Sequence, residues 1–178
     1  MSGHSRWSQI KHKKGIEDQK RGQIFSKLAK VISIAARKGT DPEKNLELKN
    51  AIERAHSFNL PKENIERAIK KVSDKNSAQL EELVIEAVGP ESTNFIITAI
   101  TDNRNRTIGE IKNILSKHES KIAQPGSVMW GFEKVGTDFI AKFPVTIQDQ
   151  NTKNKLNALF EGLDNNEDVQ EVYSNTKE

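Results

Sequence analysis

The side chains of this sequence that could carry catalysis or bind a metal are four histidines and several acidic residues. The histidines are His4, His12, His56 and His118. None of them has the close spacing of metal ligands, and the chain contains no cysteine that could complete a zinc or nucleophile site. The acidic residues are Glu81, Glu82, Asp102 and the stretch Asp164 to Asp168. They fall on separate predicted elements, which favours a solvated acidic surface over a metal site.

Motifs of nucleotide-dependent and hydrolytic enzymes are also missing from the sequence. The chain has no Gly-rich phosphate loop, no dinucleotide fingerprint and no nucleophile elbow. We therefore predict a protein that is not an enzyme, that holds no metal and no cofactor, and that has no small-molecule substrate.

The N-terminal segment carries a one-sided positive charge. Residues 1–40 contain ten Lys or Arg and two acids, a net charge of about +8. Within residues 2–15, Trp7 and Ile10 are the large apolar side chains, so no apolar periodicity buries this segment. An aromatic ring among cations can stack on a base or ribose while the cations hold phosphates. We predict an extended arm that binds an outside polyanion, and a disordered start is the alternative.

The elements behind this arm are predicted to form two domains of opposite charge. Residues 1–75 hold 18 basic and 9 acidic residues, a net charge of +9, whereas residues 76–178 hold 10 and 16, a net charge of −6. The polar stretch 73–79 lies where the net charge changes sign, and it predicts a boundary between domains 1–75 and 76–178. With no cysteine, signal peptide or apolar run of about 20 residues, we expect a cytoplasmic protein without membrane contact; an organellar matrix is the alternative.

The first domain is predicted to contain three amphipathic helices. Apolar residues at helical spacing from Asp18 onward predict a helix that ends at Gly39. Asn45 is a plausible cap for a second helix that stops near Asn59, and Leu60-Pro61 begins a third. A helix-turn-helix reader of DNA is disfavoured, because two acids in the third helix suit a major-groove helix poorly.

The second domain is predicted to be ferredoxin-like, with an extra leading strand. Strands are expected at 83–88 and 94–101, and Thr107-Ile108-Gly109-Glu110 is expected to be a capping box that starts a helix. A strand through Val128, Trp130 and Phe132 should turn at Gly136 into a strand through Phe139, Ala141 and Phe143. A helix at 156–163 and a strand at 169–173 complete the order βαββαβ and an α+β fold. The short link from Val88 to Asn94 should pair the leading strand with the second, in competition with that order, so the strand order stays open.

The loop from Asp102 to Arg106 is a candidate anion site. It precedes a helix whose N-terminal N–H groups favour negative charge, so Arg104 and Arg106 could clamp a phosphate there. The alternative is that Asp102 and Asn103 form an Asx turn and the arginines pair with local acids. The sequence leaves both interpretations open.

Six segments of the chain resemble the YebC family. They are 3–7 (Gly-His-Ser-Arg-Trp), 20–28, 59–71, 101–107, 126–132 and 168–175. They follow one another in the family's order over nearly the whole chain. The resemblance implies a gene-expression factor without catalytic activity, since members have been labelled probable DNA-binding transcriptional regulators and some are viewed as ribosome-associated translation factors.

The resemblance also implies which residues contact nucleic acid. The arm and the first helix would supply the main contacts, with the loop before residue 107 as a second patch. The predicted residues are His4, Arg6, Trp7, Lys11, His12, Lys13, Lys14, Lys20, Arg21, Lys27, Arg104 and Arg106. Family members usually carry a third domain between the strand that ends at 132–134 and the strand that enters the C-terminal helix. Here Gly136 joins Thr137 directly, so we expect a single domain closed by a hairpin.

Three functions compete at this point. We favour an RNA-binding factor at the ribosome that contacts rRNA or tRNA, because an arm carrying Trp suits unpaired bases better than a duplex. The second is a DNA-binding transcriptional regulator, which needs a reading element and normally a dimer, whereas this sequence predicts a monomer. The third is a protein-interaction factor whose acidic domain binds basic partners.

Overall fold

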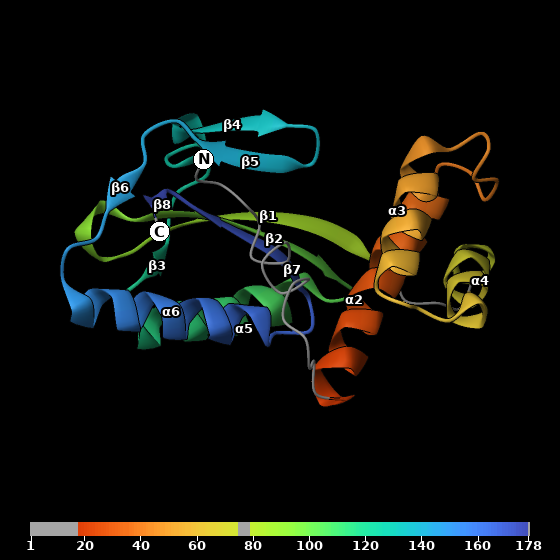
Figure 1. The fold of residues 1–178 in the computed structure, drawn as a ribbon, viewed down its shortest axis with the longest axis horizontal. Helices are drawn as coiled ribbons and strands as arrows, with labels where there is room; N and C mark the ends of the chain where they lie inside the picture. The colour runs from red at the N-terminus through yellow and green to blue at the C-terminus, as the bar shows by residue number, and fades with distance from the viewer. Residues whose placement is uncertain (1–17, 75–78, 178) are drawn as a thin grey trace. The chain divides into compact units, whose positions relative to one another are not determined.

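The computed structural model describes residues 18–74 and 79–177, which fall into two compact units that meet in sequence between Glu81 and Glu82. The first unit is helical and the second combines helices with small sheets, so the α+β class is confirmed (Figure 1). Among the described residues, no helix is both long and apolar enough to cross a membrane.

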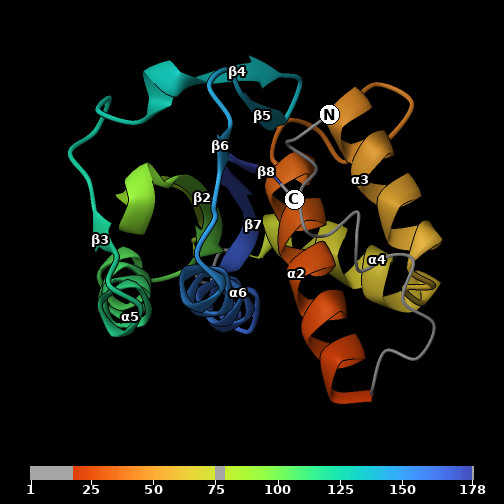
Figure 2. The same ribbon diagram turned by 60° about the vertical axis from the view of Figure 1, so that its left-hand side comes forward.

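The described residues of the first unit form three α-helices and one 3₁₀ turn. They are α2 (Asp18–Ala36), α3 (Leu46–Ser57), α4 (Lys62–Lys70) and η1 (Lys71–Ser73). The long helix α2 packs against both α3 and α4 (Figure 2). Its inward stripe is Ile24, Leu28, Ile32 and Ala35, all buried at the spacings of four and three that the sequence predicts. The prediction of three helices is therefore confirmed, and small residues such as Ala51 and Ala55 let the helices approach closely.

Asn45 holds the first unit together at the connection between α2 and α3. Its side-chain oxygen accepts a hydrogen bond from Leu48 N at 3.1 Å, which is the predicted N-cap. Its amide nitrogen donates to Ala35 O and Gly39 O at 2.8 and 2.7 Å, so the same buried side chain also satisfies the end of α2. One residue thus closes two helix termini that would otherwise leave backbone groups unpaired.

Replacing Asn45 with alanine is expected to lower the free energy of unfolding by about 1 to 2 kcal/mol, the cost of a lost cap together with unpaired carbonyls. Urea unfolding followed by far-ultraviolet circular dichroism measures the change. Asn50→Ala, at an exposed position inside α3, is the matched control and should leave stability within about 0.5 kcal/mol of the parent. Equal stability of the two variants would contradict this role for Asn45.

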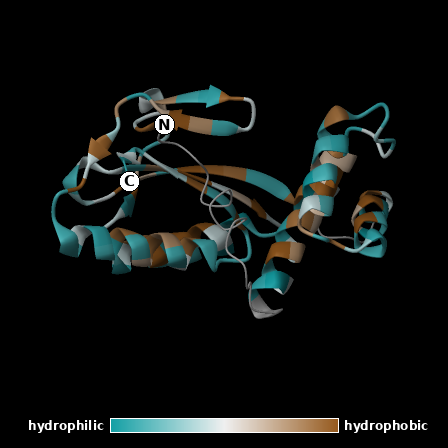
Figure 3. Ribbon diagram, in the orientation of Figure 1, coloured by the Kyte–Doolittle hydropathy of each residue, from teal (hydrophilic) through white to brown (hydrophobic). Residues whose placement is uncertain are grey.

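The second unit is built on a four-stranded sheet with the order β3-β1-β2-β7. The strands are β1 (Glu81–Val88), β2 (Asn94–Thr101), β3 (Lys121–Ile122) and β7 (Val169–Ser174). Helices α5 (Arg104–Lys117) and α6 (Gln150–Asp164) cover one face of this sheet (Figure 1). Figure 3 shows hydrophobic residues along the strands, and bands of both kinds along the two helices, as amphipathic helices have.

A β-hairpin covers the opposite face of the sheet. It consists of β4 (Phe132–Val135) and β5 (Asp138–Ala141), with Gly136 at φ 64 in its turn. Phe132, Phe139 and Ala141 from the hairpin pack with Ile96 of β2 and Tyr173 of β7. Phe95 and Ile97 of β2 face the helices instead, so β2 is buried on both faces as predicted.

The strand order differs from that of a ferredoxin-like sheet. The elements that the sequence predicts follow one another in the predicted order, with further short strands between them. However, β4 and β5 form a separate two-stranded sheet, and β1 lies beside β2 in the main sheet. The reason is the tight link between these strands, in which Gly89 N donates to Thr93 O at 2.9 Å. A Cβ atom on Gly89 would lie 2.7 Å from Thr93 Oγ1, so glycine permits this close turn.

The segment before the hairpin corrects another prediction. Residues Met129–Gly131 form the 3₁₀ turn η3, so Trp130 lies outside the strand that the alternation of Val128, Trp130 and Phe132 predicts. The cause is Glu86, whose carboxylate accepts hydrogen bonds from the backbone of this segment. The sequence also does not reveal β3 or the short pair β6 (Val145–Thr146) and β8 (Thr176–Lys177).

Candidate nucleic-acid interface

The arm residues with predicted nucleic-acid contacts lie outside the described part of the chain. They are His4, Arg6, Trp7, Lys11, His12, Lys13 and Lys14. The described candidates are Lys20, Arg21 and Lys27 on α2, and Arg104 and Arg106 on α5.

Helix α2 exposes two of its three candidate cations. Lys20 and Arg21 lie in its first turns and are exposed. The prediction that Lys27 contacts nucleic acid stays a prediction, and its side chain is only 3% exposed. The physical reason is helical spacing, since Lys27 precedes the core residue Leu28 and shares the side of the helix that carries Ile24.

Helix α4 adds exposed cations that are not among the contact residues predicted from the sequence. They are Lys62, Arg67, Lys70 and the following Lys71. The signal that identifies them is the narrow apolar stripe of α4, where Ile65 and Ala68 are buried and the charged side chains are exposed. Glu63 and Glu66 are also exposed on this helix, and Lys62 lies 3.8 Å from Glu66. The surface of α4 is thus mixed in charge.

The start of α5 differs from the predicted capping box. The N-cap is Asn103, whose side-chain oxygen accepts a hydrogen bond from Arg106 N at 3.1 Å. Thr107 lies inside the helix and is fully buried, so it does not cap it. The helix begins earlier than predicted because an asparagine satisfies the first N–H groups as well as a threonine does.

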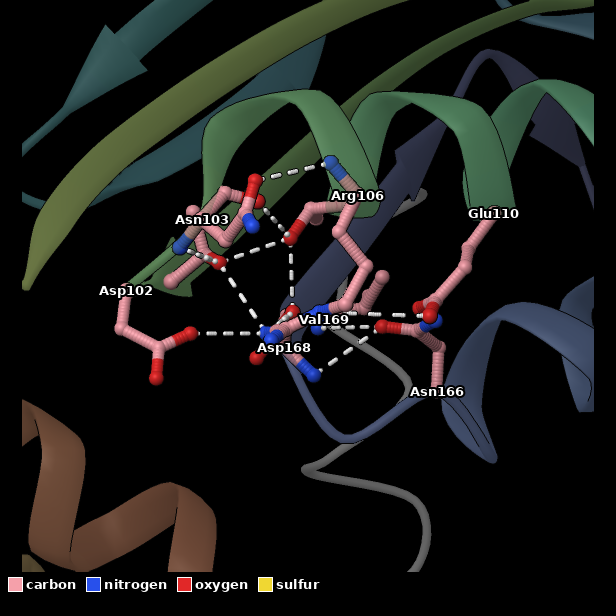
Figure 4. Close-up of polar contacts among 9 residues, drawn as sticks. Asp102, Asn103, Arg106, Glu110, Asn166, Asp168 and Val169 are labelled. Carbon is pink, nitrogen blue, oxygen red and sulfur yellow. Dashed lines mark hydrogen bonds and ion pairs between the residues drawn. The ribbon is translucent and has the colours of Figure 1, made fainter.

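Arg106 is held by two acids at this helix start. Its guanidinium nitrogen lies 2.8 Å from Asp168 Oδ2 and 2.9 Å from Asp102 Oδ1 (Figure 4). Asp168 is only 4% exposed, and its Oδ2 also accepts a hydrogen bond from Thr107 Oγ1 at 2.6 Å. Hydrogen bonds to Asp168 and then to Asp102 raise the pKa of Arg106, so its positive charge is fixed in place.

The turn before β7 is tied to the same helix. Asn166 donates to Glu110 Oε2 at 2.8 Å, and its side-chain oxygen accepts from Asp168 N and Val169 N at 3.0 and 3.2 Å (Figure 4). The backbone that carries Asp168 is therefore held by a side chain that itself contacts α5. This network joins two segments about sixty residues apart in sequence.

The loop 102–106 therefore favours the local pairing that the sequence leaves open. Arg106 forms ion pairs with three acids of its own unit, Asp102, Asp168 and, at 4.0 Å, Glu110, and Asn103 forms the expected turn. Arg104 is exposed in the first turn of α5. Among the residues that the structure describes, no group of three or more His, Cys, Asp or Glu side chains is arranged to hold a metal ion.

Known proteins resemble this chain in sequence and in structure. A family model described as "TACO1/YebC protein N-terminal domain" matches residues 5–75, and one described as "TACO1/YebC second and third domain" matches residues 80–142. The chain is also similar to a crystal structure, that of the conserved hypothetical protein Aq1575 from Aquifex aeolicus. The TM-score is 0.87 at 30% identity, over 97% of each chain.

Curated bacterial relatives carry a regulatory name. A "Probable transcriptional regulatory protein" of Petrotoga mobilis is 43% identical over 97% of this chain and 69% of the relative. One of Caldanaerobacter subterraneus is 51% identical over 80% of this chain and 59% of the relative. The chain thus spans about three fifths of the length of the second protein.

Proposed function

Because this chain belongs to the TACO1/YebC family, we propose that it is a non-enzymatic regulator of gene expression that binds nucleic acid. The observation that carries the proposal is the separation of charge along the chain, with a net charge of +9 in residues 1–75 and −6 in residues 76–178. Phosphate backbones attract such a positive half and repel the negative one, which orients the protein on its target. The names of the bacterial relatives support a regulatory role.

Within this proposal, the contacts come from the N-terminal unit and the arm that precedes it. The exposed Lys20 and Arg21 of α2 continue the cationic sequence of the arm. The cations of α4 and Arg104 are further proposed contacts. Arg106 is excluded from the main surface because Asp168 and Asp102 already hold its charge.

We propose RNA at the ribosome, rRNA or tRNA, as the first target. Support comes from the sequence of the arm, where Trp7 stands among cations that can hold phosphates while the indole stacks on an unpaired base. Helix α4 also suits a major groove poorly, since Glu63 and Glu66 are exposed beside its N-terminus. Duplex DNA is the second candidate, favoured by the transcriptional names of the relatives.

The salt dependence of binding tests whether α2 contacts phosphate. We expect the double variant Lys20→Gln, Arg21→Gln to weaken binding to single-stranded RNA by about tenfold at low salt. We also expect the slope of log affinity against log salt to become shallower by roughly 1.4, at about 0.7 for each lost contact. Fluorescence anisotropy with labelled RNA and with duplex DNA of matched length measures both quantities.

The matched control is Lys112→Gln, Lys117→Gln on the exposed side of α5, which removes the same charge from the acidic unit. Its affinity and slope should equal those of the parent chain. A salt slope near zero for the parent chain would overturn nucleic-acid binding altogether. Crosslinking in cells, followed by sequencing of the attached nucleic acid, separates ribosomal RNA and tRNA from genomic DNA as the target.

A further inference from the structure

Two large aromatic rings are exposed side by side at the open end of the hairpin. Trp130 is 63% exposed and Phe143 is 61% exposed. Their ring centroids lie 5.8 Å apart with the planes inclined at 48°. Both residues belong to the acidic unit and lie outside the predicted cationic arm. Aromatic residues that only stabilise a core are normally buried, as Phe132 and Phe139 of the hairpin are. An exposed pair of this size is therefore unusual.

The backbone around the rings holds them in one arrangement. The indole N–H of Trp130 donates to Ser127 O at 2.8 Å, so the polar atom of the ring is satisfied within the protein. Phe143 lies beyond the end of β5, outside the strand that the sequence predicts for it. Lys142 N donates to Gly131 O at 2.9 Å, which ties the segment carrying Phe143 to the turn carrying Trp130. The preceding loop is fixed by Glu86, whose carboxylate accepts from Val128 N and Met129 N at 2.6 and 2.7 Å. The exposed ring surfaces are therefore pre-organised for contact.

The charge beside the rings is positive. The ammonium group of Lys142 donates to Trp130 O at 3.1 Å and is exposed. Residues 124–131 and 141–145 contain no Asp or Glu, so Lys142 gives this surface its charge. The carboxylate of Glu86, which contacts the backbone of this loop, is buried and turned toward the backbone N–H groups. The surface thus combines a π face with a cation, although its unit is acidic as a whole.

We propose that Trp130 and Phe143 form a stacking site for an unpaired nucleobase, with Lys142 on an adjacent phosphate. This inference rests on the proposed function and gives the nucleic acid a second contact, on the acidic unit. A cation beside aromatic rings is the combination that binds single strands, because every base has a face to stack and every linkage has a charge. A basic peptide fits less well, since the segments 124–131 and 141–145 that carry the rings contain no carboxylate to pair with it. A duplex fits less well because its bases are already stacked.

Intrinsic fluorescence tests the site directly. Trp7 and Trp130 are the two tryptophans of the chain, so the variant Trp7→Phe leaves Trp130 as the reporter. We expect a short oligouridylate and a short oligothymidylate to quench its emission, and a blunt duplex to quench it less. Oligouridylate and oligothymidylate are tested in parallel to distinguish RNA from single-stranded DNA as the source of the base.

Affinity measurements complete the test. In the full chain, Trp130→Ala and Phe143→Ala should each weaken binding to the oligouridylate by about 5- to 100-fold, the range for one lost stacked base. Val135→Ala, next to the turn of the same hairpin, is the matched control, because Val135 is exposed and lies at the end away from the rings, and it should bind as the parent chain does. Circular dichroism checks that each variant keeps its secondary structure, as expected for side chains so exposed.

The outcomes separate this inference from the proposed function. If Trp130→Ala and Phe143→Ala bind normally while Lys20→Gln, Arg21→Gln loses affinity, the stacking site is overturned and the proposed function stands. If the parent chain binds neither single strands nor duplexes, both are overturned. If the main effect of Trp130→Ala is to abolish a dimer seen by light scattering, the pair is a contact between copies of the chain and the stacking site is overturned.

Discussion

Replacing Asp168 with alanine is expected to lower the free energy of unfolding by about 3 to 4 kcal/mol, although the residue carries out no chemistry. Its buried carboxylate receives a charge-assisted hydrogen bond from Arg106 at 2.8 Å and a hydroxyl bond from Thr107 at 2.6 Å. Hydrogen bonds to charged groups contribute about 1.5 to 3 kcal/mol each, and a buried donor left without an acceptor costs a comparable amount. Thr107 is fully buried, so water cannot replace the lost acceptor, and its hydroxyl would have to turn to the more distant Asn103 O at 3.2 Å.

Guanidinium chloride unfolding of the full chain measures this loss. Asp102→Ala is the matched control, because Asp102 accepts from the same guanidinium at 2.9 Å but is exposed. The control should cost no more than about 1 kcal/mol, as exposed ion pairs do. Asp168→Asn tests the charge separately, since an amide oxygen can still accept from Thr107 but carries no charge for Arg106. Equal losses for Asp168→Ala and Asp102→Ala would mean that the network does not stabilise the unit.

The parts of the fold that the sequence predicts are those set by local signals. The three helices of the first unit follow from apolar spacing and from Asn45, whose cap is made within three residues. The strand β2 is predicted to its ends because its β-branched residues are apolar on both faces. These elements depend on interactions between residues close together in sequence, which can be predicted from one sequence.

The parts of the structure that differ from the prediction depend on contacts between residues that are distant in sequence. Arg106 and Asp168 are separated by 62 positions, so nothing near Arg106 in the sequence shows that a buried acid holds it. Trp130 lies outside a strand because backbone N–H groups of its loop donate to the carboxylate of Glu86, which is more than forty residues earlier in the sequence. Lys27 is buried although lysine is rarely interior. Partners of this kind are specified by the whole fold.

Replacing Glu86 with glutamine is expected to lower the free energy of unfolding by about 2 to 3 kcal/mol at neutral pH. The carboxylate accepts from three backbone donors, Gly126 N, Val128 N and Met129 N. An amide keeps one oxygen and turns an NH₂ group toward the remaining donor, which leaves a part-buried N–H without an acceptor. Since the loop fixes the backbone at Trp130, the same change should alter the emission of Trp130 in the Trp7→Phe background.

The pH dependence of this loss identifies the carboxylate as its cause. Burial alone raises the pKa of Glu86, but the three backbone N–H groups together outweigh it, so the folded pKa lies below the ordinary value. A group with a lowered folded pKa contributes stability above its unfolded pKa, about 4.3 for glutamate, and loses that contribution as the pH falls through the folded value. The difference in free energy of unfolding between the parent chain and Glu86→Gln should therefore be constant near neutral pH and shrink in acid.

Glu119→Gln, at an exposed ion pair with Lys155, is the control, and its free energy of unfolding should differ from that of the parent by no more than about 0.5 kcal/mol. A difference between parent and Glu86→Gln that stays the same down to strongly acidic pH would show that the amide disturbs packing and that the carboxylate charge does not hold the loop.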